Sequence, residues 1–292
     1  MSEIIIGLAA GAAYSLMAVG VVVIYKCTRA LSIAQGEIGA FGLFYGLRWH
    51  DRGLPIVGWH LSSFETLLAA VVLGALIGIV FERFVMRALV SRPPLDGLIA
   101  TLGLALFLAL AELKLFGTNP AKPGHPVGSG RVTILGATLI NERLVALALA
   151  GITAVGITLF FNRTKFGLAV LATTSDPTVA KILGVPVNQV YRFAWILGGV
   201  LSGLAAALLS PVFGSLVPFS QTRFALAALA GAVVGGLDSV EGAILGSLLV
   251  GVVESVTSVA LDPGWGAVAI LALVLGTLLI RPQGLLGTSA LV

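Results

Sequence analysis

Apolar stretches long enough to cross a membrane recur along almost the whole chain. A helix needs about 20 mainly apolar residues to cross the hydrocarbon core of a bilayer. Hydrophobic residues make up 58% of this chain and charged residues only 10%, whereas a soluble domain carries about 25% charged residues. The polar surface is therefore too small to cover a soluble globule. The sequence predicts an all-α membrane protein that crosses the bilayer several times.

Nine apolar runs are candidate spans. They cover residues 4–25, 31–47, 64–81, 97–116, 143–161, 192–212, 223–237, 242–260 and 265–280. The runs at 31–47 and 223–237 are short or interrupted by polar residues, so either can be tilted, broken or re-entrant. We therefore predict eight or nine transmembrane or re-entrant helices. No long linker divides residues 1–292, which favours one transmembrane domain.

Glycine is frequent, with 37 of 292 residues, or about 13% against a usual ~7%. Glycine at every fourth position lets two membrane helices approach closely. Five pairs have this spacing, namely Gly7/Gly11, Gly74/Gly78, Gly199/Gly203, Gly231/Gly235 and Gly242/Gly246. The set predicts close helix–helix packing.

The positive-inside rule gives a modest preference for one orientation. If residues 163–192 are cytoplasmic, ten of the 17 lysines and arginines fall in inside segments, as expected for cytoplasmic loops. This orientation puts the N-terminus outside and the C-terminus inside. Residues 117–142 become a small external loop, and their alternating stretch RVTILGATLI favours a hairpin.

A short polar-flanked helix is predicted at 176–184, between two membrane-length runs. Asp176 is suited to cap its N-terminus, and Pro177 fits the first helical position, where no N–H is needed. Gly184 suits the left-handed position after the last turn, and Pro186 prevents continuation.

The same helix carries an apolar stripe. Val179, Ile182 and Leu183 fall on one face by the i, i+3, i+4 rule. A helix of about two turns is marginal alone in water. It must therefore pack either on its own bundle or on another protein.

Polar residues inside apolar runs are costly in lipid. Glu37 and Glu254 have two interpretations that the sequence leaves open, a polar pathway lining or a hydrogen bond between helices. The second interpretation is favoured for Gln35. The other polar candidates inside spans are Tyr14, Ser15 and Thr257. Glu112 and Lys114 lie two residues apart, so they do not share a helix face, and we expect both to be interfacial anchors.

Several chemistries lack their sequence motifs. No G-x-x-x-x-G-K-[ST] phosphate loop is present, so we do not expect this chain itself to bind ATP in the usual way. The lone Cys27 and three scattered histidines predict neither a disulfide nor a metal site. No G-x-S-x-G catalytic serine motif occurs. The net charge of +4 is explained by loop cations and does not indicate nucleic-acid binding.

Motifs along nearly the whole chain resemble the LivH-type permease subunits of ABC importers for branched-chain amino acids and related solutes. They include GLAAGAAYSLMAVGVVVIY, LSIAQGEIGAFG, FERFVMRAL with IATLGLAL, and the closing RPQGLLG. In LSIAQGEIGAFG, Ser32 stands where the family often has Asn, and Gln35 where it often has His. The run SDPTVAKILGV is similar to the family's cytoplasmic coupling loop.

The resemblance implies a non-enzymatic permease in the bacterial inner membrane. A second permease chain, similar or identical, would complete the pathway, with candidate lining residues as named above. Two ABC ATPase subunits would bind ATP and Mg²⁺, and a periplasmic or lipid-anchored solute-binding protein would deliver the solute. The helix at 176–184 would lie in an ATPase groove. Its coupling residues would be Asp176, Pro177, Val179, Ala180, Ile182, Leu183 and Gly184.

Two other classes of function remain open from the residues alone. A secondary transporter would place ion-coupling groups near the midplane, and only Glu37 and Glu254 are candidates. A passive channel would need a continuous polar lining, which cannot be traced. The resemblance favours a branched-chain or other amino acid as the solute and is also compatible with urea or a short amide, and no residue decides among them.

Overall fold

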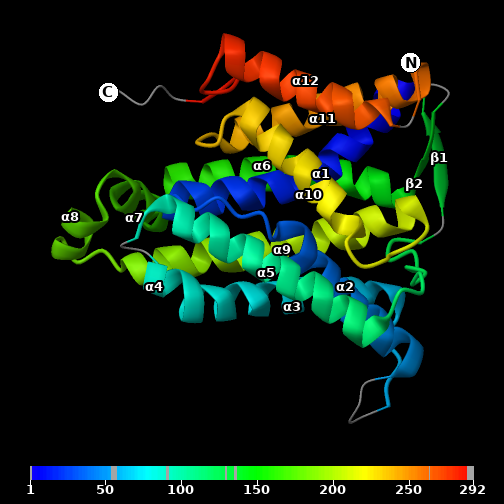
Figure 1. Cartoon of the computed structure of the whole chain (residues 1–292), viewed down its shortest axis with the longest axis horizontal. Coiled ribbons are helices and arrows are strands. Elements are labelled where there is room, and N and C mark those ends of the chain that lie inside the picture. The colour runs from blue at the N-terminus through cyan, green and yellow to red at the C-terminus, as the bar shows by residue number, and fades with distance from the viewer. Residues whose placement is uncertain are drawn as a thin grey trace.

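The structure is a computed structural model that describes residues 2–53, 58–89, 92–128, 130–134, 137–262 and 264–287. Its long helices run roughly along the longest axis of the molecule (Figure 1). The helix α1 begins at one end, and the last helix, α12, lies along one side (Figure 1). This arrangement is a helical bundle whose length suits a membrane.

A helix occupies each of the nine predicted spans. They are α1 (Ser2–Thr28), α2 (Gln35–Arg52), α3 (Ser63–Phe81), α5 (Pro94–Phe116), α6 (Asn141–Arg163), α9 (Val187–Phe213), α10 (Ser220–Gly235), α11 (Val240–Ala260) and α12 (Trp265–Ile280). Among the described residues, six are long and apolar enough to cross a membrane, namely α1, α3 with its extension, α5, α6, α9 and α11. The predicted all-α polytopic membrane fold is confirmed.

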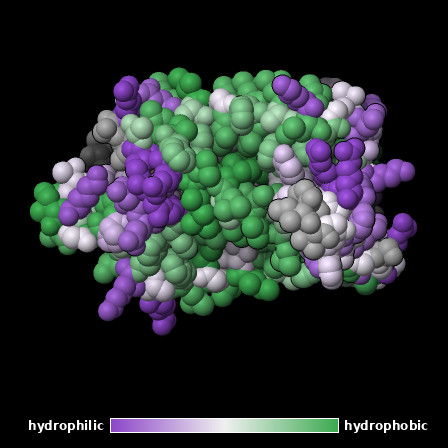
Figure 2. Space-filling model, turned by 90° about the horizontal axis from the view of Figure 1, so that it is seen from below, coloured by the Kyte–Doolittle hydropathy of each residue, from purple (hydrophilic) through white to green (hydrophobic). Residues whose placement is uncertain are grey.

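The bundle has an apolar belt between two polar ends. In the view of Figure 2 a hydrophobic band crosses the middle of the molecule, and hydrophilic residues gather toward both ends. Exposed apolar side chains of α5 and α6, such as Leu106, Phe107 and Val155, belong to the outer surface of the bundle. Such a belt is the surface expected to face lipid.

The third helix continues beyond its predicted end at residue 81. A π-helical turn at Glu82–Met86 and a short α4 (Arg87–Leu89) extend it. The buried Glu82 carboxylate lies 3.4 Å from an Arg87 nitrogen and 3.6 Å from an Arg192 nitrogen. Glu82, the first charged residue after the predicted span, is therefore paired with arginines although it is buried, so the helix can continue past it.

The glycine pairs lie at helix crossings, as predicted. Gly7 and Gly11 of α1 face Gly251 of α11, and Gly74 of α3 faces Gly199 of α9. A Cβ atom on Gly11 would lie 2.6 Å from the Ser247 carbonyl oxygen. Only glycine allows backbones to approach this closely.

The predicted span 31–47 is broken at its start. Arg29 has a φ of 55°, and this left-handed residue ends α1. The following loop turns into the bundle, so that Ser32 and Ala34 are buried, and α2 begins only at Gln35. The Thr101 hydroxyl of α5 lies 3.1 Å from the Leu31 carbonyl oxygen and so helps to satisfy this buried backbone.

The hairpin predicted within residues 131–140 is present. Strands β1 (Arg131–Ile134) and β2 (Ala137–Ile140) pair antiparallel, with Arg131 opposite Ile140. The hairpin lies at the end of the bundle where α1 begins, whereas α7 (Lys165–Ser175) and α8 (Pro177–Ile182) lie at the opposite end (Figure 1). The predicted separation of the 117–142 loop from the 176–184 helix is therefore confirmed.

Candidate functional site

The short helix α8 is held by the caps that the sequence predicted. The Asp176 carboxylate accepts hydrogen bonds from the backbone N–H groups of Thr178 (2.7 Å) and Val179 (3.0 Å). Pro177 is the first helical residue. At the other end Gly184 has a φ of 81°, which favours glycine. The helix is therefore defined at both ends by local chemistry.

The tip of α8 does not pack on its own bundle. Only Ala180 is buried, at 1% exposure, whereas Ile182 is 80% and Leu183 is 74% exposed. Val179 is half exposed. The stripe predicted to need a partner thus has none within the described chain, and α8 lies at the extreme end of the molecule (Figure 1).

The helix α7 was not predicted. Its N-cap is Thr164, whose hydroxyl accepts a hydrogen bond from the Gly167 N–H at 3.0 Å. Asp176 both ends α7 and caps α8, so the two helices form one elbow. The signal in the sequence was the threonine cap before the amphipathic stretch KFGLAVLATTS.

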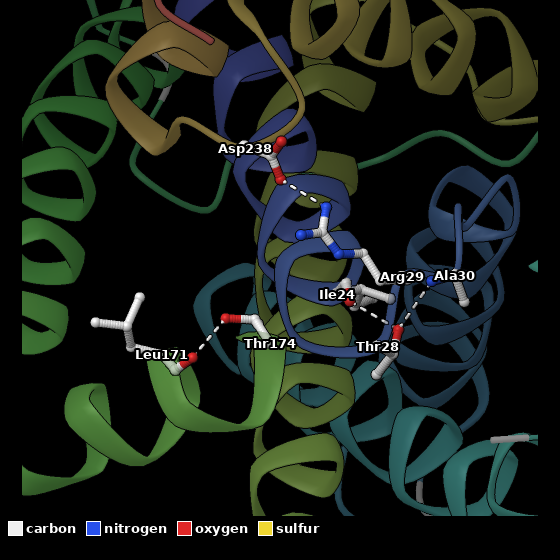
Figure 3. Close-up of polar contacts among 7 residues, drawn as sticks. All are labelled: Ile24, Thr28, Arg29, Ala30, Leu171, Thr174 and Asp238. Carbon is white, nitrogen blue, oxygen red and sulfur yellow. Dashed lines mark hydrogen bonds and ion pairs between the residues drawn. The ribbon is translucent and has the colours of Figure 1, made fainter. Parts of the chain in front are cut away.

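An ion pair lies near the same end of the bundle. The Arg29 side chain is directed toward Asp238 in the loop before α11, and the two groups are 3.1 Å apart (Figure 3). Both side chains are substantially exposed, so we expect a contribution to stability of less than about 1 kcal/mol. The pair links the end of α1 to the α10–α11 connection.

A first polar cluster joins the beginnings of α2 and α10 to α9. Ser202 of α9 donates to the Gln35 side-chain oxygen, and Gln35 in turn donates to Ser32 at 3.3 Å. Thr222 of α10 donates to the Glu37 carboxylate. Gln35 and Glu37 are both buried. The structure thus gives each of them a helix-linking contact.

Glu112 corrects the sequence prediction of an interfacial anchor. Its side chain is fully buried, and neither carboxyl oxygen has a hydrogen-bond partner within the described part of the chain. Lys114, two residues further on, is exposed as expected. Residues two apart on a helix lie on different faces. Lys114 therefore faces outward, and Glu112 faces the interior of the bundle.

A second polar cluster surrounds Glu254 of α11. Tyr14 of α1 donates to one carboxylate oxygen at 2.8 Å, and Arg223 of α10 pairs with the other at 2.9 Å. The Arg223 side chain is 62% exposed. Sequence reasoning missed Arg223, although a charged residue in a predicted span was a signal.

The remaining pathway candidates, Ser15 and Thr257, belong to neither polar cluster. The Ser15 hydroxyl donates to the Ala12 carbonyl of its own helix, which is a local structural contact. Thr257 is partly exposed on α11.

Glu254 and Arg223 also line a groove of about 440 Å³. The rest of the groove is mostly apolar and is formed by α10 and α12, with residues such as Leu226, Val233 and Ile270. Glu254, one of the predicted pathway residues, therefore borders an open groove. Within the described ranges no group of three or more histidine, cysteine or acidic residues is placed to hold a metal ion.

Comparison with known proteins decides the family. The model of the family described as "Branched-chain amino acid transport system / permease component" matches residues 3–280. The chain belongs to this family. It is a membrane permease of the ABC importer class, in agreement with the sequence resemblance.

Individual relatives align with nearly the whole chain. The chain is 27% identical to the high-affinity branched-chain amino acid transport system permease protein BraD of Pseudomonas aeruginosa, covering 98% of this chain and 95% of the relative. It is 25% identical to LivH of Escherichia coli K12, covering 96% and 93%. The solved structure of PsaBC from Streptococcus pneumoniae in complex with Fab has a TM-score of 0.51 and 14% identity, covering 95% of this chain and 91% of that chain. That likeness concerns the fold alone.

Proposed function

We propose that this permease carries a branched-chain amino acid and forms half of a pathway completed by a second permease chain. Separate ATPase subunits bind ATP and Mg²⁺ and drive it, and a solute-binding protein delivers the cargo. The names of the full-length relatives support the choice of solute. The α8 end faces the cytoplasm in this proposal, and the N-terminus faces outward.

The exposed tip of α8 carries the proposal that this helix is the ATPase contact. Ile182 and Leu183 leave most of their apolar surface in water unless another protein covers it. An amphipathic helix that docks in a groove of a partner is a common recognition mode. Rigid caps at Asp176 and Gly184 suit a helix that must transmit movement.

Assembly with the ATPase subunits tests this proposal directly. Affinity purification of the permease should bring down an ATPase, and uptake of radiolabelled leucine by the assembled importer should stop when ATP is withdrawn. Leucine uptake that continues without ATP would contradict the proposal.

The α10–α12 groove is the proposed pathway face. Glu254 lies six residues before the end of α11. This spacing places it about 9 Å from that end along the helix axis. Arg223 is bound there to Glu254, and its side chain is largely exposed. An exposed charge at this depth is costly against lipid. We therefore place water or the second permease chain, and not lipid, over this face.

Replacing Glu254 with glutamine should lower uptake about tenfold, because it removes a charged group from the proposed pathway face. The complex should stay assembled, because a partly exposed ion pair contributes only about 1 kcal/mol or somewhat more to stability. The measurement is initial uptake rate together with subunit recovery. Glu241→Gln, on the first turn of the same helix, is the matched control. Normal uptake in Glu254→Gln with an intact complex would contradict a pathway role.

Replacing Gly184 with valine should weaken transport without preventing membrane insertion. A Cβ atom at Gly184 meets no neighbour within 4 Å, so the cost arises only from the left-handed backbone, about 1–2 kcal/mol for an L-residue. The measurement is leucine uptake normalised to membrane-inserted protein. Gly184→Asn is the matched control, since asparagine tolerates this conformation. Equal uptake in the two variants would argue against a rigid C-terminal cap.

A further inference from the structure

A basic cavity lies at the end of the bundle that carries α8. It has a volume of about 470 Å³ and is formed where α1 and α6 end and α7 begins. Lys26, Arg163 and Lys165 line it, and no acidic residue does. Three cations with no counter-charge in the lining make the cavity a favourable place for an anion.

The walls of this cavity are held by local contacts. The Thr164 hydroxyl donates to the Phe160 carbonyl oxygen at 2.7 Å and accepts from the Gly167 N–H at 3.0 Å. The Lys26 ammonium lies 5.4 Å from the centre of the Phe161 ring. The α6–α7 elbow is therefore preformed, which lowers the entropy lost on binding a ligand.

Among the described residues, the nearby acidic group Glu241 offsets the charge of Lys26 but not that of the other two lining cations. Glu241 interacts electrostatically with Lys26. Its carboxylate accepts a hydrogen bond from Thr158 at 2.6 Å, however, and it does not line the cavity. Arg163 and Lys165 are both exposed and have no ion-pair partner within the described part of the chain.

An apolar track leads from the cavity into the hydrophobic belt. Leu168 and Leu171 of the lining are 67% and 59% exposed. In Figure 3 the Leu171 side chain points away from the α1 ribbon. On the adjoining helix α6, exposed Ile152, Val155 and Leu159 have the spacing of one helix face. A soluble anion would leave these apolar surfaces uncovered, whereas acyl chains would cover them.

We propose that this cavity binds the head group of an acidic phospholipid, with the acyl chains lying along α6. Lys26, Arg163 and Lys165 contact the phosphate, and Leu168 and Leu171 contact the glycerol and first methylene groups. Cationic pockets between membrane helices at the cytoplasmic side have the charge that such lipids require.

The position of the cavity bears on coupling. The lipid would contact the first turns of α7, and Asp176 at the end of α7 caps α8. A lipid bound here therefore limits movement of the α7–α8 elbow. This consequence rests on the proposed coupling role of α8, but binding of the lipid does not.

The test uses the full-length chain in nanodiscs of phosphatidylcholine with phosphatidylglycerol added in steps. Lipid retained by the protein is measured by native mass spectrometry, and a second series titrates inorganic phosphate into nanodiscs that contain both lipids. The double variant Arg163→Gln/Lys165→Gln removes two lining cations. Its matched control, Arg83→Gln/Lys181→Gln, removes two exposed cations that lie outside the cavity.

The parent chain should retain phosphatidylglycerol in preference to phosphatidylcholine. The Arg163→Gln/Lys165→Gln variant should lose about tenfold or more of this preference, and the control should keep it. Lys26→Gln should weaken retention by a smaller factor. Equal retention of the two lipids by the parent, or parent-like retention by the double variant, would overturn the proposal. Displacement of the lipid by millimolar phosphate would assign the cavity to a soluble anion instead and would also overturn it.

Discussion

Replacing both Ile182 and Leu183 with aspartate should abolish ATP-dependent uptake and separate the ATPase subunits from the permease. Burial of each of these side chains contributes about 1.5–3 kcal/mol. Both are largely exposed in the isolated chain, so their loss removes contacts with a partner and not contacts within the bundle. We expect ATPase binding to fall by more than a hundredfold. The measurement is co-purification of the ATPase with the tagged permease.

The matched control is Lys181→Gln, which changes a neighbouring exposed residue of α8 without touching the apolar tip. Size-exclusion chromatography should show the same monodisperse permease for the parent, the double variant and the control. If the double variant retains its ATPase and transports at the parental rate, α8 is not the coupling element. Loss of ATPase from the Lys181→Gln control as well would show that the Lys181 charge is also required and that apolar contact alone does not explain binding.

Replacing Gly11 with valine should prevent folding of the permease. A Cβ atom at this position would lie 2.6 Å from the Ser247 carbonyl oxygen and 2.7 Å from the Leu248 Cα atom. These are backbone atoms of α11, so neither can move without separating the two helices. Overpacking of a core costs about 1–3 kcal/mol where side chains can adjust, and we expect more here. The measurement is the yield and thermal stability of detergent-purified protein.

Gly103→Val is the matched control for Gly11→Val. Gly103 lies within α5, and a Cβ atom there would meet no neighbour within 4 Å. This control carries the same helix-propensity penalty of a β-branched residue without the clash. Equal yields of the two variants would contradict the importance of the α1–α11 approach.

The membrane fold was largely predictable because it depends on local composition. Apolar runs fixed the places of the nine helices, although their ends moved by several residues. The largest difference occurred at the end of the third span, where the helix runs on past residue 81. At Glu82 the helix continues because arginines from two elements neutralise the carboxylate, and distant partners such as Arg192 cannot be read from a local pattern.

The candidate site was predictable in part. The caps of α8 follow from Asp176, Pro177 and Gly184, which act through their own backbone. The companion helix α7 was missed because its threonine cap and short amphipathic stretch lie next to a much stronger apolar signal. The hydrogen bond and the ion pair of Glu254 come from Tyr14 and Arg223, which are distant in the sequence, so a local pattern could not predict them.

The sequence by itself determined that this protein folds in a membrane, the approximate places of the helices in its nine apolar runs, and the short capped helix. These properties arise from interactions within a few residues, such as hydropathy over one span or a cap within one turn. Only the tertiary structure decided which polar residues meet, which glycines face one another, and which apolar and basic surfaces are left without a partner. Those properties depend on the rotation of each helix about its axis, and that rotation is set by packing against helices that are distant in the sequence.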